Sequence, residues 1–124
     1  MVRALELGSG AQLIGTPPDD LHFALIGRLT SLGLFRNVQG RMSADWVARQ
    51  SRTDPNADFA PPPEGVVLLG VGLETEIETG RVTLQCSIDA FNLLNTVYRD
   101  YTSLRRYFAD QPGRDIRLRV GFNL

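Results

Sequence analysis

The last nine residues, "IRLRVGFNL" from Ile116 to Leu124, alternate strictly between apolar and polar side chains. A period of two predicts a β-strand that has one apolar face and one polar face. Such a strand carries backbone donors and acceptors along both of its edges, and these groups need partners. The rest of the chain is therefore expected to supply further strands.

Four earlier stretches show the same alternation, and no segment longer than a few residues has the period of a helix. In each stretch most positions of one alternate set are apolar, and most positions of the other set are polar or glycine. The sequence therefore predicts an all-β fold, an antiparallel meander of about five strands. The four further strands are expected at Leu21–Thr30, Val38–Gln50, Val67–Ile77 and Val82–Ala90.

The connections between these strands alternate in length. Residues 31–37 and 78–81 form short connections, whereas 51–66 and 91–115 are long, and the first long connection is rich in Pro, Asp and Asn. Short turns at one end and long loops at the other are typical of transmembrane β-barrels, whose strands turn one face to lipid. In a closed barrel the terminal strand also finds a partner on each side.

Five strands are too few to close such a barrel, because bacterial single-chain barrels have about eight or more. We therefore expect the chain to be part of a larger barrel. Residues 1–20 are interpreted as a partial strand and an extracellular loop. Residues 21–124 are interpreted as the strands of an incomplete barrel.

Composition excludes several other classes of function. The 13 basic residues are balanced by 14 acidic residues, so charge gives no sign of a nucleic-acid partner. With a single cysteine (Cys86) and a single histidine (His22), we expect no intrachain disulfide and no metal site. No nucleophile accompanies the acidic residues of the predicted strands, so we expect no catalytic residue, no cofactor and no enzymatic activity.

The segment from Asp89 to Leu124 resembles the C-terminal end of TonB-dependent outer-membrane receptors. The resemblance rests on the order and spacing of a motif, followed by an alternating terminal strand; "LIGTPPDDLHFAL" and "ADWVARQSRTDPNADF" upstream are also similar to segments of these barrels. The motif residues are Asn92, Leu93, Asn95, Tyr98, Arg99, Asp100, Tyr101, Pro112, Gly113 and Arg114, and the terminal-strand residues are Ile116, Leu118, Val120, Phe122 and Leu124.

The resemblance implies a fragment of a receptor and transporter that takes up a ferric siderophore, a metal chelate or a cobalamin-like nutrient. It implies a location in the outer membrane of a Gram-negative bacterium once the chain is joined to an upstream signal and the remaining barrel. The implied partners are outer-membrane lipid, the remaining barrel strands and plug, and the barrel-insertion machinery. The TonB energy-coupling system would be a partner only of the intact protein.

The motif also has a physical interpretation of its own. Asn92 and Asn95 suit turns at the end of a strand, and Tyr98, Tyr101 and Tyr107 suit the outer membrane interface. An alternative hypothesis is a soluble or oligomeric β-sheet binding module with no transport role, which would bury its apolar faces against itself or against a second copy.

Overall fold

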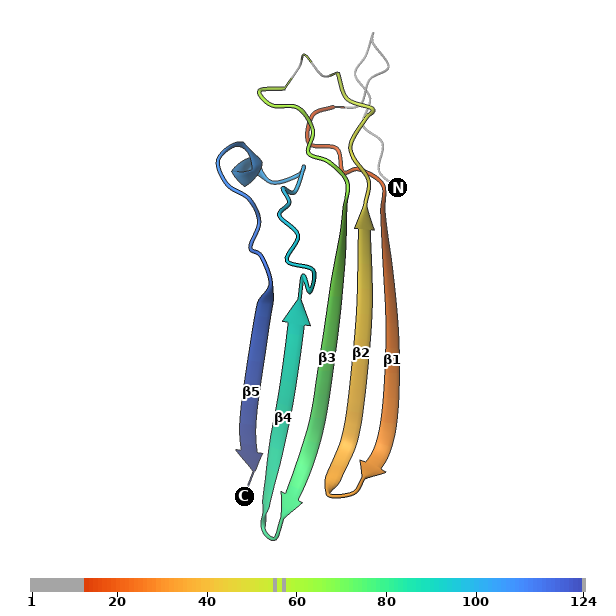
Figure 1. Cartoon of the computed structure of the whole chain (residues 1–124), viewed down its shortest axis with the longest axis vertical. Helices are drawn as coiled ribbons and strands as arrows, with labels where there is room; N and C mark the ends of the chain where they lie inside the picture. Colours follow the sequence, from red (N-terminus) through yellow and green to blue (C-terminus); the bar gives the residue numbers. More distant parts are fainter. Residues whose placement is uncertain (1–12, 55, 57, 124) are drawn as a thin grey trace. The chain divides into compact units, whose positions relative to one another are not determined.

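The computed structural model describes residues 13–54, 56 and 58–123 of the chain. It confirms the predicted all-β antiparallel meander, with five strands in the sheet order β1-β2-β3-β4-β5 (Figure 1). The predicted partial strand before residue 13 and the terminal Leu124 lie outside the described residues. The elements are β1 (Asp20–Leu32), β2 (Phe35–Val47), β3 (Val66–Thr79), β4 (Val82–Phe91), the short 3-10 helix η1 (Leu104–Tyr107) and β5 (Asp115–Asn123).

The chain divides into two compact units, which we call the strand unit and the loop unit. The strand unit holds most of the sheet, and the loop unit holds the long connections together with the strand ends next to them. The strand unit is His22–Asp45, Leu68–Thr96 and Gly113–Leu124, and the loop unit is Met1–Leu21, Trp46–Val67 and Val97–Pro112.

The pairing register places apolar residues opposite apolar residues. Ile88 of β4 lies opposite Leu118 of β5 and opposite Leu73 of β3, so these three side chains share one face of the sheet. The intervening Ser87 lies opposite Arg119 on the other face. The alternation in the sequence is thus converted into one apolar face and one polar face.

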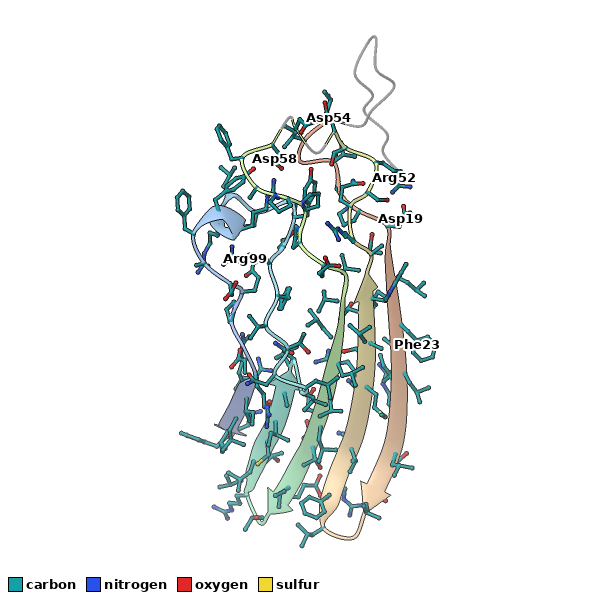
Figure 2. All side chains as sticks on the ribbon, turned by 45° about the horizontal axis from the view of Figure 1, so that its top comes forward. Asp19, Phe23, Arg52, Asp54, Asp58 and Arg99 are labelled. Carbon is teal, nitrogen blue, oxygen red and sulfur yellow. The ribbon has the colours of Figure 1, made fainter. Side chains whose placement is uncertain are left out.

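Most of the large apolar side chains on the apolar face are exposed in the described part of the chain. Leu118 is 72% exposed and Phe23 is 63% exposed, and Figure 2 shows Phe23 projecting away from β1. The buried apolar residues among those described are only Val66, Ala90 and Tyr101. The described residues therefore form no second layer over this face. The hydrophobic effect can stabilise the sheet only if atoms outside the described residues cover the face.

Two tight turns join the strands at one end of the sheet. Gly33 and Gly80 each occupy the first central position of a two-residue turn with φ of 62°. A positive φ at that position is characteristic of type II′ turns, which match the twist of the paired strands. The first connection is thus shorter than predicted, because the structure extends β1 to Leu32 and begins β2 at Phe35.

The sequence prediction missed the start of β2 because the alternation is interrupted there. Asn37 has φ of 50°, in the left-handed region, and Arg36 and Asn37 both reach glutamates of β3 on the polar face. Two consecutive residues on one face are the signature of a β-bulge. Thr75 donates a hydrogen bond of 3.0 Å to the carbonyl of Arg36 at this bulge.

We predict that Asn37→Val destabilises the fold by about 1–2 kcal/mol, because a β-branched residue is poorly tolerated in the left-handed region. Asn37→Gly, the control, keeps the backbone conformation and loses only the hydrogen bond to Glu76, so it should cost clearly less. Denaturant unfolding of both variants measures the difference. Equal destabilisation would show that the side-chain hydrogen bond, and not the backbone conformation, matters at this position.

Candidate functional site

The first part of the predicted motif forms the turn that ends β4. Asn92 and Asn95 have φ of 49° and 52°, a conformation that asparagine tolerates better than most residues. The Asn92 side chain both donates to the carbonyl of Thr96 and accepts from its N–H, at 2.9 Å each. The turn is therefore fixed by side-chain hydrogen bonds to its own backbone.

This turn also receives the start of β5, far along the chain. The N–H of Arg114 donates to Oδ1 of Asn95 at 2.9 Å. A Cβ atom at Gly113 would lie 2.6 Å from the same oxygen, so glycine is required there. The N–H of Leu93 donates to the carbonyl of Leu69 of β3 at 3.0 Å. Asn92, Leu93, Asn95, Gly113 and Arg114 are thus brought together in the strand unit, in a structural role.

The second part of the motif lies in the loop unit, where its residues form bonds with other residues of the same long connection. Tyr98 accepts a hydrogen bond on its carbonyl from the N–H of Gln111, and Arg99 forms an ion pair of 2.5 Å with Asp110. Arg99 also donates to the carbonyl of Arg106 at 2.9 Å. Asp100 accepts from the N–H and the hydroxyl of Thr102. Pro112 is the last residue of the loop unit.

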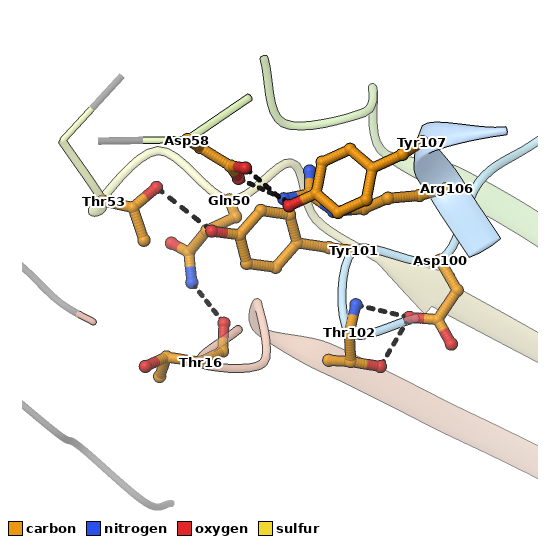
Figure 3. Close-up of polar contacts among 9 residues, drawn as sticks. All are labelled: Thr16, Gln50, Thr53, Asp58, Asp100, Tyr101, Thr102, Arg106 and Tyr107. Carbon is orange, nitrogen blue, oxygen red and sulfur yellow. Dashed lines mark hydrogen bonds and ion pairs between the residues drawn. The ribbon is translucent and has the colours of Figure 1, made fainter. Parts of the chain in front are cut away.

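The centre of the loop unit is a buried ion pair between Asp58 and Arg106 (Figure 3). The side chains of both residues are only 3% exposed. The Tyr107 hydroxyl donates to Asp58 at 2.6 Å and accepts from Nη2 of Arg106 at 2.7 Å. These three side chains join the connection after β2 to the connection after β4.

Two tyrosine rings cover the guanidinium group of Arg106. Its Cζ lies 4.4 Å from the centroid of the Tyr101 ring and 4.5 Å from that of Tyr107, distances at which cation–π attraction operates. Tyr101 is buried, and its hydroxyl contacts Thr53 at 3.5 Å. The ring of Tyr101 therefore packs inside the loop unit, and its expected place near an outer membrane interface stays a prediction.

The environment shifts the pKa values of this cluster in consistent directions. Burial alone would raise the pKa of Asp58, but hydrogen bonds from Tyr107 and Arg106 and the charge of Arg106 hold this pKa below its usual range. Burial alone would lower the pKa of Arg106, but Asp58 raises it above its usual range. The hydrogen bond with Asp58, followed by burial, raises the pKa of Tyr107. Both members of the ion pair are therefore charged at neutral pH.

A buried glutamine attaches a third segment to the loop unit. Gln50 donates to the carbonyl of Thr16 at 2.8 Å and accepts from the N–H of Arg52 at 3.0 Å. Arg52 in turn forms an ion pair of 2.8 Å with Asp19, and this contact raises the pKa of Arg52. The segment before β1 and the two long connections are thus fastened into one folded body.

The loop unit contains two open cavities. One of about 360 Å³ is bordered by prolines, by the carboxylates of Asp20, Glu64 and Asp100, and by Tyr98 and Tyr101. A second, of about 290 Å³, is lined by three arginines and a proline run. Both have the size of small-molecule sites, and their donors and acceptors are suited to binding. A nucleophile activated by a neighbouring base is not among their described lining residues.

The polar face of the strand unit carries its own ionic network. Asp89 is nearly buried between Arg41 of β2, at 2.9 Å, and Arg119 of β5, at 2.5 Å. Gly72 of β3 makes this possible, since a Cβ there would lie 2.7 Å from Oδ1 of Asp89. His22, on the same face, contacts Asp45. These acidic groups are therefore engaged with basic partners on other strands.

The terminal-strand residues follow the predicted alternation. Ile116, Leu118 and Val120 lie opposite Ala90, Ile88 and Cys86 on the apolar face, and Phe122 lies opposite Leu84. All four are exposed. Leu124, predicted to complete this row, lies outside the described residues.

The described residues contain no cluster of three or more His, Cys, Asp or Glu side chains that could hold a metal ion. Among the helices of the described part of the chain, none has the length and apolar character to cross a membrane. Comparison of the chain with protein-family models, with curated proteins and with solved structures gave no match.

The receptor-like motif in the sequence also covers Arg106 and Tyr107, but it gave no sign of their partner Asp58, nor of the buried Gln50 and Thr53. Asp58 lies in a segment whose Pro, Asn and Asp content is that of any exposed loop. Its pairing with Arg106 spans 48 residues of sequence. The sequence contained one hint of this buried cluster, the aromatic residues around Arg106, because Tyr and Arg side chains often form cation–π contacts.

We predict that Asp58→Asn destabilises the loop unit by about 3 kcal/mol, because Arg106 would keep a buried charge without its counter-ion. Hydrogen exchange of the amides in 97–112 measures this local stability. The matched control is Asp110→Asn, which removes an exposed partner of Arg99 and should cost less than about 1 kcal/mol. Equal effects of the two variants would contradict a dominant role for the buried pair.

We predict that amide protection in the loop unit is lost below about pH 4. The folded-state pKa of Asp58 lies below its unfolded value of 3.8, so the pair contributes its full stability above that value. The contribution falls as the pH drops through the folded-state pKa. Hydrogen exchange as a function of pH measures the loss, and Asp58→Asn should remove the part that depends on Asp58.

Proposed function

We propose that the chain contributes C-terminal strands and ligand-facing loops to an outer-membrane barrel of the TonB-dependent receptor class, which takes up a ferric siderophore, a metal chelate or a cobalamin-like nutrient. The observation that carries the proposal is the exposed apolar face of a single-layered antiparallel sheet. Lipid covers such a face in a barrel, whereas a water-soluble protein has to cover it with a second layer of its own or with a partner.

The opposite face supports the same proposal. Several of its charged side chains form ion pairs between different strands: Arg36 with Glu78, and Asp89 with Arg41 and Arg119. A barrel lumen is polar and hydrated, so paired charges can lie there at low cost. Charged side chains on the opposite, apolar face would be costly in lipid.

The long connections favour a ligand-binding receptor over a barrel with a purely structural role. The two type II′ turns are at one end of the sheet, and the chain leaves for the long connections at the other. Those connections form a body with buried polar contacts and cavities instead of extended tails. Fixed loops that frame cavities can select a ligand with little loss of entropy on binding.

Open edges support the assignment of these strands to a larger barrel. In the described residues, β1 and β5 each pair with one strand only. An edge strand in hydrocarbon leaves backbone groups unsatisfied at several kcal/mol each. Further strands on both sides would satisfy these groups.

We predict that the full chain, diluted from urea, gains strand structure and floats with phospholipid vesicles, and that Leu118→Arg reduces this association. Arginine on a lipid-facing strand costs about 2–4 kcal/mol near the bilayer centre. The control is Gln85→Arg, which adds the same residue to the polar face, where it should have little effect. Circular dichroism and vesicle flotation measure structure and association.

The outcomes separate this proposal from its alternative. Strand structure in plain buffer, in a discrete soluble species that ignores vesicles, would favour the soluble or oligomeric binding module. Failure to gain strand structure with vesicles, or equal effects of the two arginine variants, would also contradict the membrane proposal.

A further inference from the structure

The second cavity of the loop unit brings three arginines next to a wall of consecutive prolines. Its volume is about 290 Å³, and it is lined by Ala60 and the three prolines that follow it, by Glu64, and by Arg49, Arg99 and Arg106. Proline fixes its own φ, so the wall from Pro61 to Pro63 has little freedom to collapse into the cavity. Glu64 is the only acidic residue in this described lining.

Arg106, one of the residues that line this cavity, carries an unsatisfied donor. Its Nη2 binds Asp58 and Tyr107, and its Cζ lies close to the rings of Tyr101 and Tyr107. Its Nη1 is buried and, among the described residues, has no hydrogen-bond acceptor. A buried charged donor without an acceptor is unfavourable, so an acceptor reaching it would stabilise the site.

The structure already shows how a carboxylate is held at this cavity. Nη1 of Arg49 lies 2.6 Å from Oε1 of Glu64. The Glu64 side chain is 80% exposed, and such a surface pair contributes little net stability. A competing anion can therefore displace Glu64 at small cost. Arg99, held by Asp110 and the carbonyl of Arg106, adds a third guanidinium in a fixed position.

We propose that this cavity binds a small oxyanion, a carboxylate or phosphate group, which displaces Glu64 from Arg49 and accepts a hydrogen bond from Nη1 of Arg106. Neighbouring atoms cover Nη1, so binding includes a small movement of the lining. Arginine is well suited to both kinds of anion because its planar group donates in parallel pairs. The proposal concerns the loop unit alone and does not depend on insertion of the strands into lipid.

The test is isothermal titration of the full refolded chain with inorganic phosphate and, separately, with acetate. We expect saturable binding of at least one of these probes. Arg49→Gln should weaken it roughly tenfold or more, since it removes a charge-assisted hydrogen bond. Glu64→Gln should strengthen it about two- to fivefold, because it removes the competing carboxylate.

The matched control is Arg52→Gln. Arg52 belongs to the same unit and is paired with the exposed Asp19, but it does not line this cavity. Its substitution should leave the affinity unchanged within about twofold. Limited proteolysis of each variant checks that the loop unit remains folded.

Several results would overturn the proposal: no saturable binding of either probe, weaker binding after Glu64→Gln, or equal losses from Arg49→Gln and Arg52→Gln. The last result would indicate a general attraction of anions to arginine. Because vesicle association is measured separately, failure of anion binding and failure of membrane insertion are distinguishable.

Discussion

The rest of the structure depends on the two-residue period of the backbone ladder. Each antiparallel pairing places the side chains of neighbouring strands on matching faces, so a one-residue error would mix polar and apolar groups. The pairing of Ile88 with both Leu73 and Leu118 shows that three consecutive strands keep the same register. The bulge at Asn37 makes the same constraint visible, because it inserts an extra polar residue without reversing the faces of β2.

A sheet with two such different faces cannot be stable by itself in water. Its backbone hydrogen bonds are made, but the hydrophobic effect contributes only where apolar area is removed from water. Leu118 and Phe23 are largely exposed, so most of the apolar area of the described chain can be removed from water only by its surroundings. Lipid on one face and water on the other meet this requirement most simply, and for this reason the membrane interpretation is the one we propose.

The loop unit is stabilised by a different interaction. It has almost no apolar core, and its buried centre is the Asp58–Arg106 pair with the rings of Tyr101 and Tyr107. A charge pair is costly to bury, but once buried it penalises any arrangement that separates the partners. The two long connections are therefore held in a specific relation to each other. Such fixed loops can frame a cavity, which flexible loops of the same composition would not do.

The sequence by itself determined the fold class, most strand positions and the division into two faces, because alternation is a local property of neighbouring residues. It also marked Asn92 and Asn95 as turn residues, since asparagine tolerates the left-handed conformation. Only the tertiary structure decided that Asn95 meets Gly113 and Arg114, that Tyr101 is buried, and that Asp58 pairs with Arg106. These contacts join residues far apart in the chain, and their formation depends on how the long connections fold, on which a local pattern carries no information.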